Sequence, residues 1–318
     1  MKLKDRSKAS AYGGAGWSPR KKPLREEIGT IWAHSGVESE WAPLKSVLLH
    51  CPGPELENVT EPDKVQMLEG LDHNLVCQQH DALADAFRDA GVSVSFVEPS
   101  ETPPPNLMFM ADLFFMTPEG AILARPASTV RAGEERFVAR RLAELGVPIL
   151  RSVRGTGTFE GADAAWIDSE TVLIGVGLRT NREGASQVSS LLQEMNVEPI
   201  TVDLPHGSMH LMGNLRFAGR DLSVCRSGRT PYRAMQALRE RGYSLVFAPD
   251  EEEVAKGMSL NFVTLGPGRI LMAAGNPATQ SFYEDVGIKC NTVEIHELAK
   301  AAGGIGCLTG ILEREKRD

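Results

Sequence analysis

The chain has 318 residues, of which 42% are hydrophobic and 24% charged, and its formal net charge is −8. This composition is typical of a globular protein with a sizeable core, whereas a dedicated nucleic-acid binder would need a basic surface to neutralise phosphates. No apolar run reaches the roughly 18 residues of a membrane-spanning helix, so we expect neither nucleic acid nor membrane as a partner.

The cysteines do not form a recognisable framework. They are odd in number and none belongs to a Cys-x-x-Cys pair, so the sequence predicts neither a disulfide scaffold nor a structural zinc site. The basic N-terminus lacks the apolar core of a secretory signal, and we expect a cytoplasmic protein. The five cysteines are Cys51, Cys77, Cys225, Cys290 and Cys307.

Residues 1–38 mix Lys, Arg, Ser, Gly and Pro, a composition typical of a flexible extension. The alternative is a flap over a functional site. We expect residues 39–318 to form a single catalytic domain, with ordered structure beginning at the apolar run 44–50.

One pattern then recurs towards the C-terminus. A helix-like stretch ends in a Gly or Asn suited to the left-handed C′ position, and a short β-rich run follows. Units of nearly equal length indicate a radial array of five units rather than two unrelated domains. The alternative is a chance α/β alternation in an open sheet. The five end residues are Gly91, Gly146, Asn196, Gly242 and Gly287, spaced 55, 50, 46 and 45 residues apart.

Two strand-like runs precede the helix in each of the last four units, but only one does so in the first. We expect the segment that carries Cys307, continuing through Ile311 and Leu312, to supply the missing strand and close the ring beside the central axis. No glycine-rich phosphate-binding loop follows a first strand, which argues against nucleotide binding. The paired runs are 107–115 with 121–124, 164–167 with 171–174, 209–217 with 222–225, and 261–265 with 269–272.

Cys307 lies in the glycine-rich stretch 303–310. Glycines allow a ligand to approach the main chain, so this thiol could be an accessible nucleophile. The alternative is a buried core cysteine beside a turn. A single cysteine gains a catalytic interpretation only with a distant histidine and carboxylates.

Three carboxylates are candidate partners. Asp112 is embedded in an almost wholly apolar run, where a carboxylate must be paired because a lone buried charge is costly. It could act on a ligand or form a structural salt bridge to an internal arginine. Glu160 and Asp163 are separated only by small residues and could converge on one cation, or could lie on a solvated turn.

The candidate proton donor is His210. His206 and His210 have the spacing of a helical metal-ligand pair, but Pro205 and Gly207 disfavour a helix and no third ligand follows nearby, so we expect no metal. His210 enters an apolar strand and suits acid–base chemistry; the alternative is a core histidine with satisfied hydrogen bonds.

Together these residues match the requirements of chemistry at a guanidinium group. That group is a planar cation whose carbon is deactivated by resonance. Attack on it requires carboxylates to bind the N–H groups, a thiolate nucleophile and a proton donor for the departing amine. The residues that fit are Asp112, Glu160, Asp163, Cys307 and His210.

The chain also resembles the guanidino-modifying enzymes of the pentein fold: arginine deiminases, dimethylargininases and arginine amidinotransferases. The resemblance covers about residues 40–313. It is carried by Pro105-Asn106-Leu107 with Asp112, Phe159-Glu160-Gly161-x-Asp163, Gly177-Leu178-Arg179-Thr180, His210-Leu211 and Gly303-Gly304-x-x-Cys307, and earlier by Leu48-Leu49-His50-x-Pro52-Gly53 with Gln79-His80-Asp81-Ala82.

This resemblance implies a five-bladed α/β propeller of ββαβ units. It implies that Cys307 attacks the guanidinium carbon to give a covalent amidino-cysteine (thiouronium) adduct. His210 would protonate the leaving amine and then activate water or an incoming amine. Glu160 would orient His210 or bind the guanidinium.

The resemblance also implies how the substrate is held. Asp112 would bind the guanidinium and Arg179 a substrate carboxylate, and we count Asp163 among the substrate-binding residues. No metal or organic cofactor is needed. The expected partner is a small guanidino or ureido amino acid, and the sequence leaves open whether the chain forms a homo-oligomer.

The sequence departs from deiminases in two respects. Deiminases and amidinotransferases carry an aspartate two residues after the histidine, where this chain has Met212. Dimethylargininases also lack that aspartate, so a substituted guanidine or a neutral ureido group becomes plausible. The chain also has no room for the extra helical domain of bacterial deiminases, which makes deimination of plain arginine less certain.

We therefore expect a hydrolase acting on a guanidino or ureido compound related to arginine. The first alternative is an amidinotransferase, in which an amine rather than water resolves the adduct. The second is a non-catalytic binding protein on the same fold.

Overall fold

Five three-stranded sheets organise the chain over residues 17–57 and 59–316, the part that this computed structural model describes. In every sheet the middle strand pairs antiparallel with the first strand and parallel with the third. The sheets consist of β15 (Gly310–Arg314), β1 (Leu44–Leu49) and β2 (Ser93–Phe96); β3 (Phe114–Thr117), β4 (Gly120–Leu123) and β5 (Ile149–Ser152); β6 (Ala164–Asp168), β7 (Thr171–Val176) and β8 (Glu198–Asp203); β9 (Leu215–Phe217), β10 (Leu222–Cys225) and β11 (Ser244–Phe247); and β12 (Val263–Gly266), β13 (Arg269–Ala273) and β14 (Lys289–Val293).

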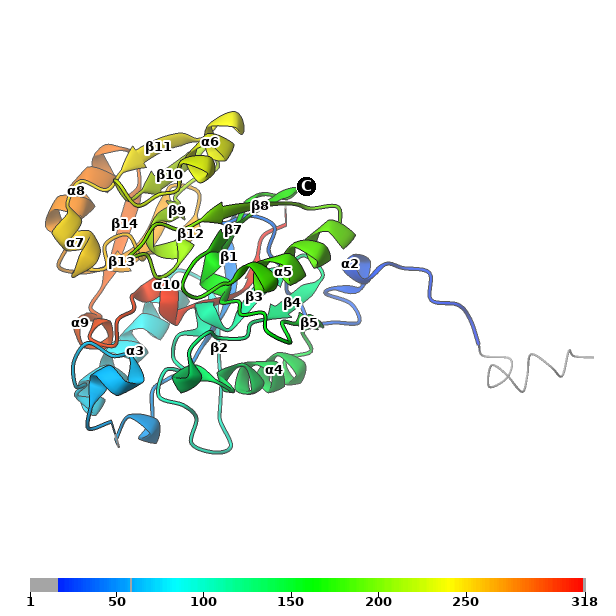
Figure 1. Ribbon diagram of the computed structural model, residues 1–318, viewed down its shortest axis with the longest axis horizontal. Coiled ribbons are helices and arrows are strands. Elements are labelled where there is room, and N and C mark those ends of the chain that lie inside the picture. The colour runs from blue at the N-terminus through cyan, green and yellow to red at the C-terminus, as the bar shows by residue number, and fades with distance from the viewer. Residues whose placement is uncertain (1–16, 58, 317–318) are drawn as a thin grey trace, which may run out of the picture.

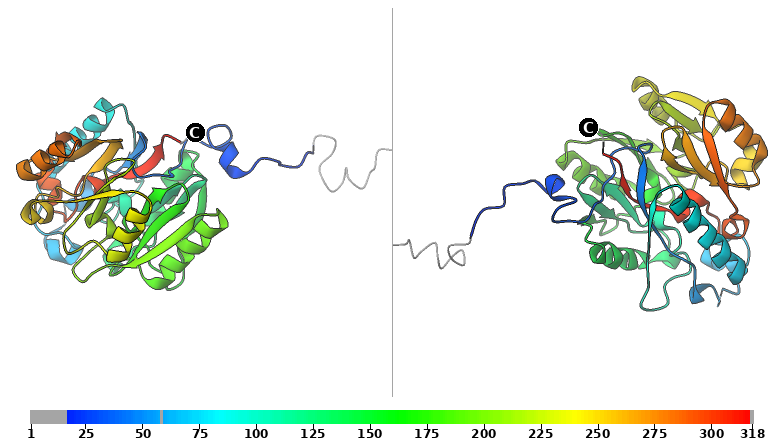
Figure 2. Two further views of the ribbon diagram at one scale, coloured as in Figure 1. Left: turned by 90° about the horizontal axis from the view of Figure 1, so that it is seen from above. Right: turned by 180° about the vertical axis from the view of Figure 1, so that it is seen from behind.

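A crossover helix joins the two parallel strands of each sheet, because parallel neighbours need a long connection. These helices lie on the outside of the molecule and the strands face its centre (Figures 1 and 2). The predicted five-bladed propeller of ββαβ units is confirmed. The crossover helices are α3 (His73–Asp89), α4 (Glu134–Glu144), α5 (Arg182–Glu194), α6 (Tyr232–Glu240) and α8 (Pro277–Asp285).

Shorter helices connect these units. Among the described residues, four of them are α-helical: α2 (Leu24–Glu27), α7 (Glu251–Ala255), α9 (His296–Ala299) and α10 (Ile305–Leu308). Six are 3₁₀ turns: η1 (Pro54–Leu56), η2 (Pro62–Val65), η3 (Met110–Asp112), η4 (Thr129–Arg131), η5 (Gly161–Asp163) and η6 (Leu211–Gly213).

The five residues predicted to end the crossover helices all have a left-handed backbone. Gly91, Gly146, Gly242 and Gly287 have φ angles between 75° and 86°, and Asn196 has φ 60°. Glycine reaches this region without steric cost and asparagine tolerates it. Local backbone chemistry therefore sets the period of the propeller.

The two ends of the propeller meet in the first blade. Strand β15 pairs antiparallel with β1, with Ile311 opposite Val47 and Gly310 opposite Leu48, and Figure 2 shows the red C-terminal strand beside the blue first strand. The predicted ring closure is confirmed. Cys307 itself lies just before this strand, in the single turn α10.

Two of the predicted strands are wrong over most of their length. In the runs 107–115 and 209–217, β3 begins only at Phe114 and β9 only at Leu215. The preceding residues form η3 and η6, held by local bonds such as Leu113 N–H to the Met110 carbonyl, 3.1 Å. These runs are apolar because they are buried at the centre of the propeller, and burial alone does not distinguish a strand from a turn.

The predicted N-terminal extension, residues 1–38, is described only in part, and residues 1–16 lie outside the described residues. Ile28 and Val37 are buried. The Gly36 N–H donates to the Leu312 carbonyl at 2.9 Å, and the Ala33 N–H to the Gly146 carbonyl at 3.0 Å. Within residues 17–57 and 59–316, no helix combines the length and apolar character needed to cross a membrane.

Candidate active site

The candidate residues share one place in the architecture: each lies immediately before the first strand of a different blade. Asp112 ends η3 before β3, Glu160 caps η5 before β6, and His210 caps η6 before β9. Cys307 lies in α10 before β15. Because the blades are arranged around one axis, these points converge, although up to 195 residues separate Asp112 from Cys307 in the chain.

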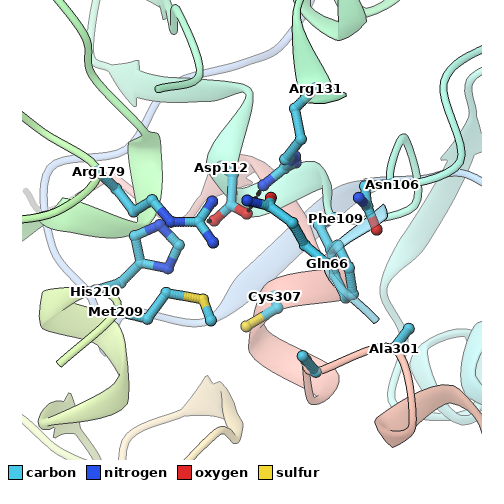
Figure 3. Close-up of a pocket in the computed structure, with 12 residues that line it drawn as sticks. Gln66, Asn106, Phe109, Asp112, Arg131, Arg179, Met209, His210, Ala301 and Cys307 are labelled. Carbon is cyan, nitrogen blue, oxygen red and sulfur yellow. Dashed lines mark hydrogen bonds and ion pairs between the residues drawn. The ribbon is translucent and has the colours of Figure 1, made fainter. Parts of the chain in front are cut away.

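A pocket of about 330 Å³, including its open mouth, lies at this convergence. Figure 3 shows Asp112, Arg179, His210 and Cys307 around the same space. Glu160 lies behind His210 and does not line the pocket. The lining residues are Gln66, Asn106, Phe109, Asp112, Arg131, Arg179, Met209, His210, Ala301, Ala302, Gly303 and Cys307.

Asn261 holds the half-buried thiol of Cys307. Its side-chain amide donates to the Cys307 sulfur at 3.0 Å, and its side-chain oxygen accepts the Cys307 backbone N–H, also at 3.0 Å. Burial, with the nearby Asp112 carboxylate, raises the pKa of Cys307, although the Asn261 hydrogen bond and Arg216 act in the opposite direction. The thiol is therefore protonated in the resting protein at neutral pH.

Glycine is needed around Cys307 for a different reason from the one that we expected from the sequence. We expected them to admit a ligand to the main chain, but protein atoms occupy the positions where their Cβ atoms would lie. A Cβ on Gly303 would lie 2.3 Å from Cε1 of Phe109, and one on Gly304 would lie 2.8 Å from Cβ of Asn261. These glycines allow α10 to pack closely against its neighbours and so fix the position of the thiol.

His210 and Glu160 form a buried pair. Nε2 of His210 lies 2.6 Å from Oε2 of Glu160 and 3.8 Å from Oδ1 of Asp112. Burial alone would lower the pKa of His210, but Asp112, Asp163 and Glu160 together raise it to about 9. Burial raises the pKa of Glu160, yet His210 and the nearby arginines outweigh it and bring that pKa down to about 2. The pair is an imidazolium–carboxylate at neutral pH.

Asp112 forms a salt bridge with an internal arginine, which is one of the two roles expected for it. Its second carboxylate oxygen is still available to a ligand. Its Oδ2 accepts from Nη1 of Arg131 at 2.6 Å. Its Oδ1 is buried and has no hydrogen-bond partner among the described residues. A buried carboxylate oxygen without a donor is costly, and a guanidinium N–H from a ligand would satisfy it.

Asp163, predicted to bind substrate, does not line the pocket. It is fully buried, and its oxygens accept from Thr180 Oγ1 at 2.6 Å and from the Leu211 N–H at 2.9 Å. Burial raises its pKa to about 6, although His210 and these hydrogen bonds oppose the shift. Asp163 therefore holds the turn that follows His210, and its role in substrate binding stays a prediction.

Arg179, which we expect to bind a substrate carboxylate, lines the pocket, but its partner in this structure is internal. Its Nη1 lies 3.4 and 3.5 Å from the two carboxylate oxygens of Glu160. Only 7% of the residue is exposed.

Of the two histidines with metal-ligand spacing, His206 is exposed and only His210 is buried.

One triad at the centre has ligand atoms close enough to hold a cation: Asp112, Glu160 and His210, within 4.8 Å of one another. The Arg131 and Arg179 guanidiniums already compensate these carboxylates, with Arg131 Nη1 3.7 Å from Glu160. A divalent cation would face both guanidiniums at short range, so the charge arrangement disfavours a metal here.

Sequence reasoning missed Arg131 and Asn261. Arg131 bridges Asp112 and Glu134, with Nη2 2.8 Å from the glutamate, and the Arg131–x–x–Glu134 spacing was the only local signal. Asn261 lies just before β12, the position that the other blades use for their functional residues. The repeat itself could have identified Asn261, but residues 261–265 were assigned to a strand.

A second cavity shares a wall with the first. Met209, His210, Ala302 and Cys307 line both. The second cavity adds Met212, Met258 and Leu260, together with Asn261. Cys307 and His210 therefore lie between a cavity lined by Asp112, Arg131 and Arg179 and a cavity that contains Met212, Met258 and Leu260. The second cavity is also lined by the polar residues Ser208, Asn214 and Arg226.

The sequence of this chain is similar to those of known proteins. A sequence model of the arginine deiminase family matches residues 95–226 and 225–314, more than half of the chain. A dimethylarginine dimethylaminohydrolase from Streptomyces coelicolor is 29% identical over 84% of this chain and 96% of its own length. An arginine deiminase from Borrelia duttonii is 22% identical over 88% of this chain and 98% of its own length.

Solved structures share the fold. A dimethylarginine dimethylaminohydrolase from Pseudomonas aeruginosa, in a mutant form complexed with citrulline, superposes with a TM-score of 0.71 at 22% identity, covering 84% of this chain and 98% of its own. An amidinotransferase from Microseira wollei gives 0.71 at 14% identity, covering 89% and 98%.

Proposed function

The chain belongs to the arginine deiminase family, and from that premise we propose that it uses Cys307 to hydrolyse a substituted arginine through a covalent amidino-cysteine adduct. As a member of this family it is a hydrolase of C–N bonds in linear amidines. The substrate, the intermediate and the residue roles below are our proposal.

One observation carries the proposal. A thiol, an imidazolium and a carboxylate oxygen without a donor lie around one pocket, on Cys307, His210 and Asp112. A guanidinium group needs a nucleophile at its carbon, an acid at its leaving nitrogen and an acceptor for its remaining N–H groups. The pocket offers each of these on a separate residue.

In the first step the cationic substrate binds against Asp112. Its positive charge beside Cys307 opposes the burial that raises the pKa of the thiol, so the thiol releases its proton to solvent when substrate arrives. The thiolate then attacks the guanidinium carbon and forms a C–S bond. His210 donates its proton to the departing nitrogen as the C–N bond breaks, and a neutral amine leaves.

In the second step the neutral His210 takes a proton from water, and the water oxygen attacks the carbon of the adduct. Collapse of the resulting tetrahedral centre breaks the C–S bond and regenerates the thiolate, and the hydroxyl proton is lost to solvent, so that a neutral ureido product leaves. Glu160 holds His210 by the 2.6 Å contact and stabilises its charged form in both steps. Arg179, at the pocket wall, would bind the carboxylate of the substrate.

Met212 supports a substituted rather than a plain guanidine. It lines the second cavity, beside the wall formed by Cys307 and His210. An aspartate there would bind the N–H groups of an unsubstituted nitrogen, whereas a thioether contacts methyl groups favourably and offers no charge. A dimethylated nitrogen directed to this side, with the free N–H groups on Asp112, is the fit that we propose.

Intact-mass spectrometry tests the proposal. Purified protein is incubated with asymmetric dimethylarginine, arginine, citrulline and agmatine, and the reaction is stopped in acid. We expect dimethylamine and citrulline from dimethylarginine, and an adduct of the amidino compound on the protein. In Cys307→Ser the adduct should be absent and turnover should fall by at least about 10³-fold, whereas Cys290→Ser, a half-buried cysteine in β14, should behave as wild type.

The other outcomes contradict the proposal in distinct ways. A new guanidino compound formed with ornithine or glycine, without citrulline, identifies an amidinotransferase. Binding without turnover or adduct, unchanged in Cys307→Ser, identifies a non-catalytic binding protein. The cytoplasmic location, a single domain over residues 39–318 and homo-oligomer formation stay predictions.

A further inference from the structure

A second group of ligand-type side chains lies outside the active-site pocket, where β1 meets α3. Cys51 follows the end of β1, while Cys77, His80 and Asp81 lie on α3. Positions three and four apart on a helix share one face, so α3 presents these three together. One ligand atom each from Cys51, His80 and Asp81 lies within 4.8 Å of the other two.

His80 is the member that calls for an explanation. It is completely buried, and neither ring nitrogen has a hydrogen-bond partner among the described residues. Buried polar atoms without partners are rare and cost free energy. Burial and the nearby His50 lower the pKa of His80 to about 4, so its ring is neutral and offers a lone pair at neutral pH.

Cys77 completes the group. The Cys51 and Cys77 thiols affect each other's pKa and both approach the Pro52 carbonyl, at 3.7 and 3.5 Å. Burial, Cys77 and the carboxylates of Asp81 and Glu55 raise the pKa of Cys51 to about 12. The same negative surroundings that disfavour a thiolate favour a bound cation, which displaces the thiol protons as it binds.

We propose that Cys51, Cys77, His80 and Asp81 bind a Zn²⁺ ion. Two thiolates, one imidazole and one carboxylate are a tetrahedral zinc ligand set. Neighbouring ligand atoms in such a site are about 3.3–3.8 Å apart, so shifts of about 1 Å would bring Cys51, His80 and Asp81 around a metal. Cys77 lies outside that group of three, and its side chain would have to turn from the Pro52 carbonyl and His73 towards the ion.

The metal has a structural role. None of its ligands lines the pocket that contains Cys307, and its ligands join the end of β1 to α3, the crossover helix of the first blade. The sequence argued against zinc because no Cys-x-x-Cys pair is present. The ligands instead come from a loop and a helix that only the tertiary structure brings together.

Cobalt titration of the full chain tests the site. The Cys307→Ser variant, reduced and freed of metal, is titrated with Co²⁺, so that no active-site thiolate contributes. We expect one equivalent to give a thiolate-to-cobalt charge-transfer band and intense visible bands typical of a tetrahedral site, both lost on adding Zn²⁺. Adding Cys51→Ser or Cys77→Ser leaves one thiolate ligand, so each should weaken the charge-transfer band, and both together should remove it. Adding Cys290→Ser should leave the band unchanged.

Stability gives a second readout. Zn²⁺ should raise the Tm of Cys307→Ser in a concentration-dependent way, and this shift should be lost with Cys51→Ser. Because His80 is buried and its replacement could unfold the chain, the exposed Asp81 is changed to Asn instead. We expect this change to weaken zinc affinity by at least about tenfold in competition with a chromogenic chelator.

Three results would overturn the proposal. The first is no charge-transfer band from the reduced Cys307→Ser protein. The second is a band that persists at full strength with Cys51→Ser and with Cys77→Ser. The third is a Cys51–Cys77 disulfide in the purified protein together with no metal uptake after reduction.

Discussion

The side chain of Asn261 contacts Cys307 twice, through a 3.0 Å bond from its amide to the sulfur and a 3.0 Å bond from the Cys307 backbone N–H to its oxygen. These two bonds hold the thiol in place, and the amide bond opposes the larger effect of burial, which raises the pKa of Cys307. The fifth blade therefore contributes to the centre as the other four do, through the residue just before its first strand.

Removal of the Asn261 amide should raise the pKa of Cys307 further, because that hydrogen bond favours the thiolate. In Asn261→Ala the pH profile of alkylation by iodoacetamide should move to higher pH, and adduct formation should slow by about tenfold. Asn276→Ala, which removes a buried asparagine whose amide donates to the carbonyls of Gly257, Ala273 and Ala274, is the matched control. An unchanged alkylation profile in Asn261→Ala would show that the bond does not tune the thiol.

Loss of the Glu160 charge should lower the pKa of His210, the proposed proton donor. Glu160 contributes to the raised pKa of His210, so in Glu160→Gln that pKa falls and less of His210 is protonated at neutral pH. We expect kcat to fall by about 10²–10³-fold, with the alkaline limb of the kcat profile displaced to lower pH. Equal losses at every pH, with no displaced limb, would mean that Glu160 acts only on structure.

The pair of His210 and Glu160 makes the free energy of unfolding depend on pH. The pKa of His210 in the fold, about 9, lies above its ordinary value of 6.5. The stability that His210 contributes to the fold is complete below pH 6.5 and is lost as pH rises through 9. The pKa of Glu160, about 2, lies below its ordinary 4.5, so its contribution is complete above pH 4.5 and is lost as pH falls through 2.

Urea unfolding should therefore show stability declining between pH 6.5 and 9, and the decline should be smaller in His210→Gln. Leu245→Val, a substitution in β11 away from the pair, serves as a control that lowers stability without changing its slope with pH. Parallel pH profiles for wild type and His210→Gln would contradict the assigned shift.

Met212 should determine substrate preference. In Met212→Asp the ratio of kcat/KM for arginine to kcat/KM for dimethylarginine should rise by about tenfold or more, because the new carboxylate binds free N–H groups and loses contact with methyl groups. Met212→Leu keeps the apolar character and should leave the ratio within about threefold of wild type. A ratio that moves equally in both variants would exclude the proposed selectivity.

Gly303 and Phe109 should be coupled. A methyl group on Gly303 overlaps the Phe109 ring, 2.3 Å from Cε1, so Gly303→Ala should lower the free energy of unfolding by about 1–3 kcal/mol. Phe109→Leu removes the overlapping ring atoms and should restore part of that loss in the double variant. Strict additivity in the double-mutant cycle would show that the two residues do not contact.

The sequence by itself determined the period of the fold and the types of chemical group at its centre. Gly91, Gly146, Asn196, Gly242 and Gly287 have positive φ because of a local backbone preference, which needs no tertiary information. Cys307, His210 and Asp112 were identifiable because a thiol, an imidazole and a carboxylate stand out in apolar or glycine-rich surroundings.

The tertiary structure decided which atoms meet. Asn261 and Arg131 are ordinary residues in sequence, and they become parts of the site only because the blades converge on one axis. Asp163 carries the same charge as Asp112, yet its oxygens already accept hydrogen bonds from Thr180 and the Leu211 N–H, and it does not line the pocket. Thr180 and Leu211 lie far from Asp163 in the chain, and the local sequence around Asp163 carries no signal for contacts between residues so widely separated.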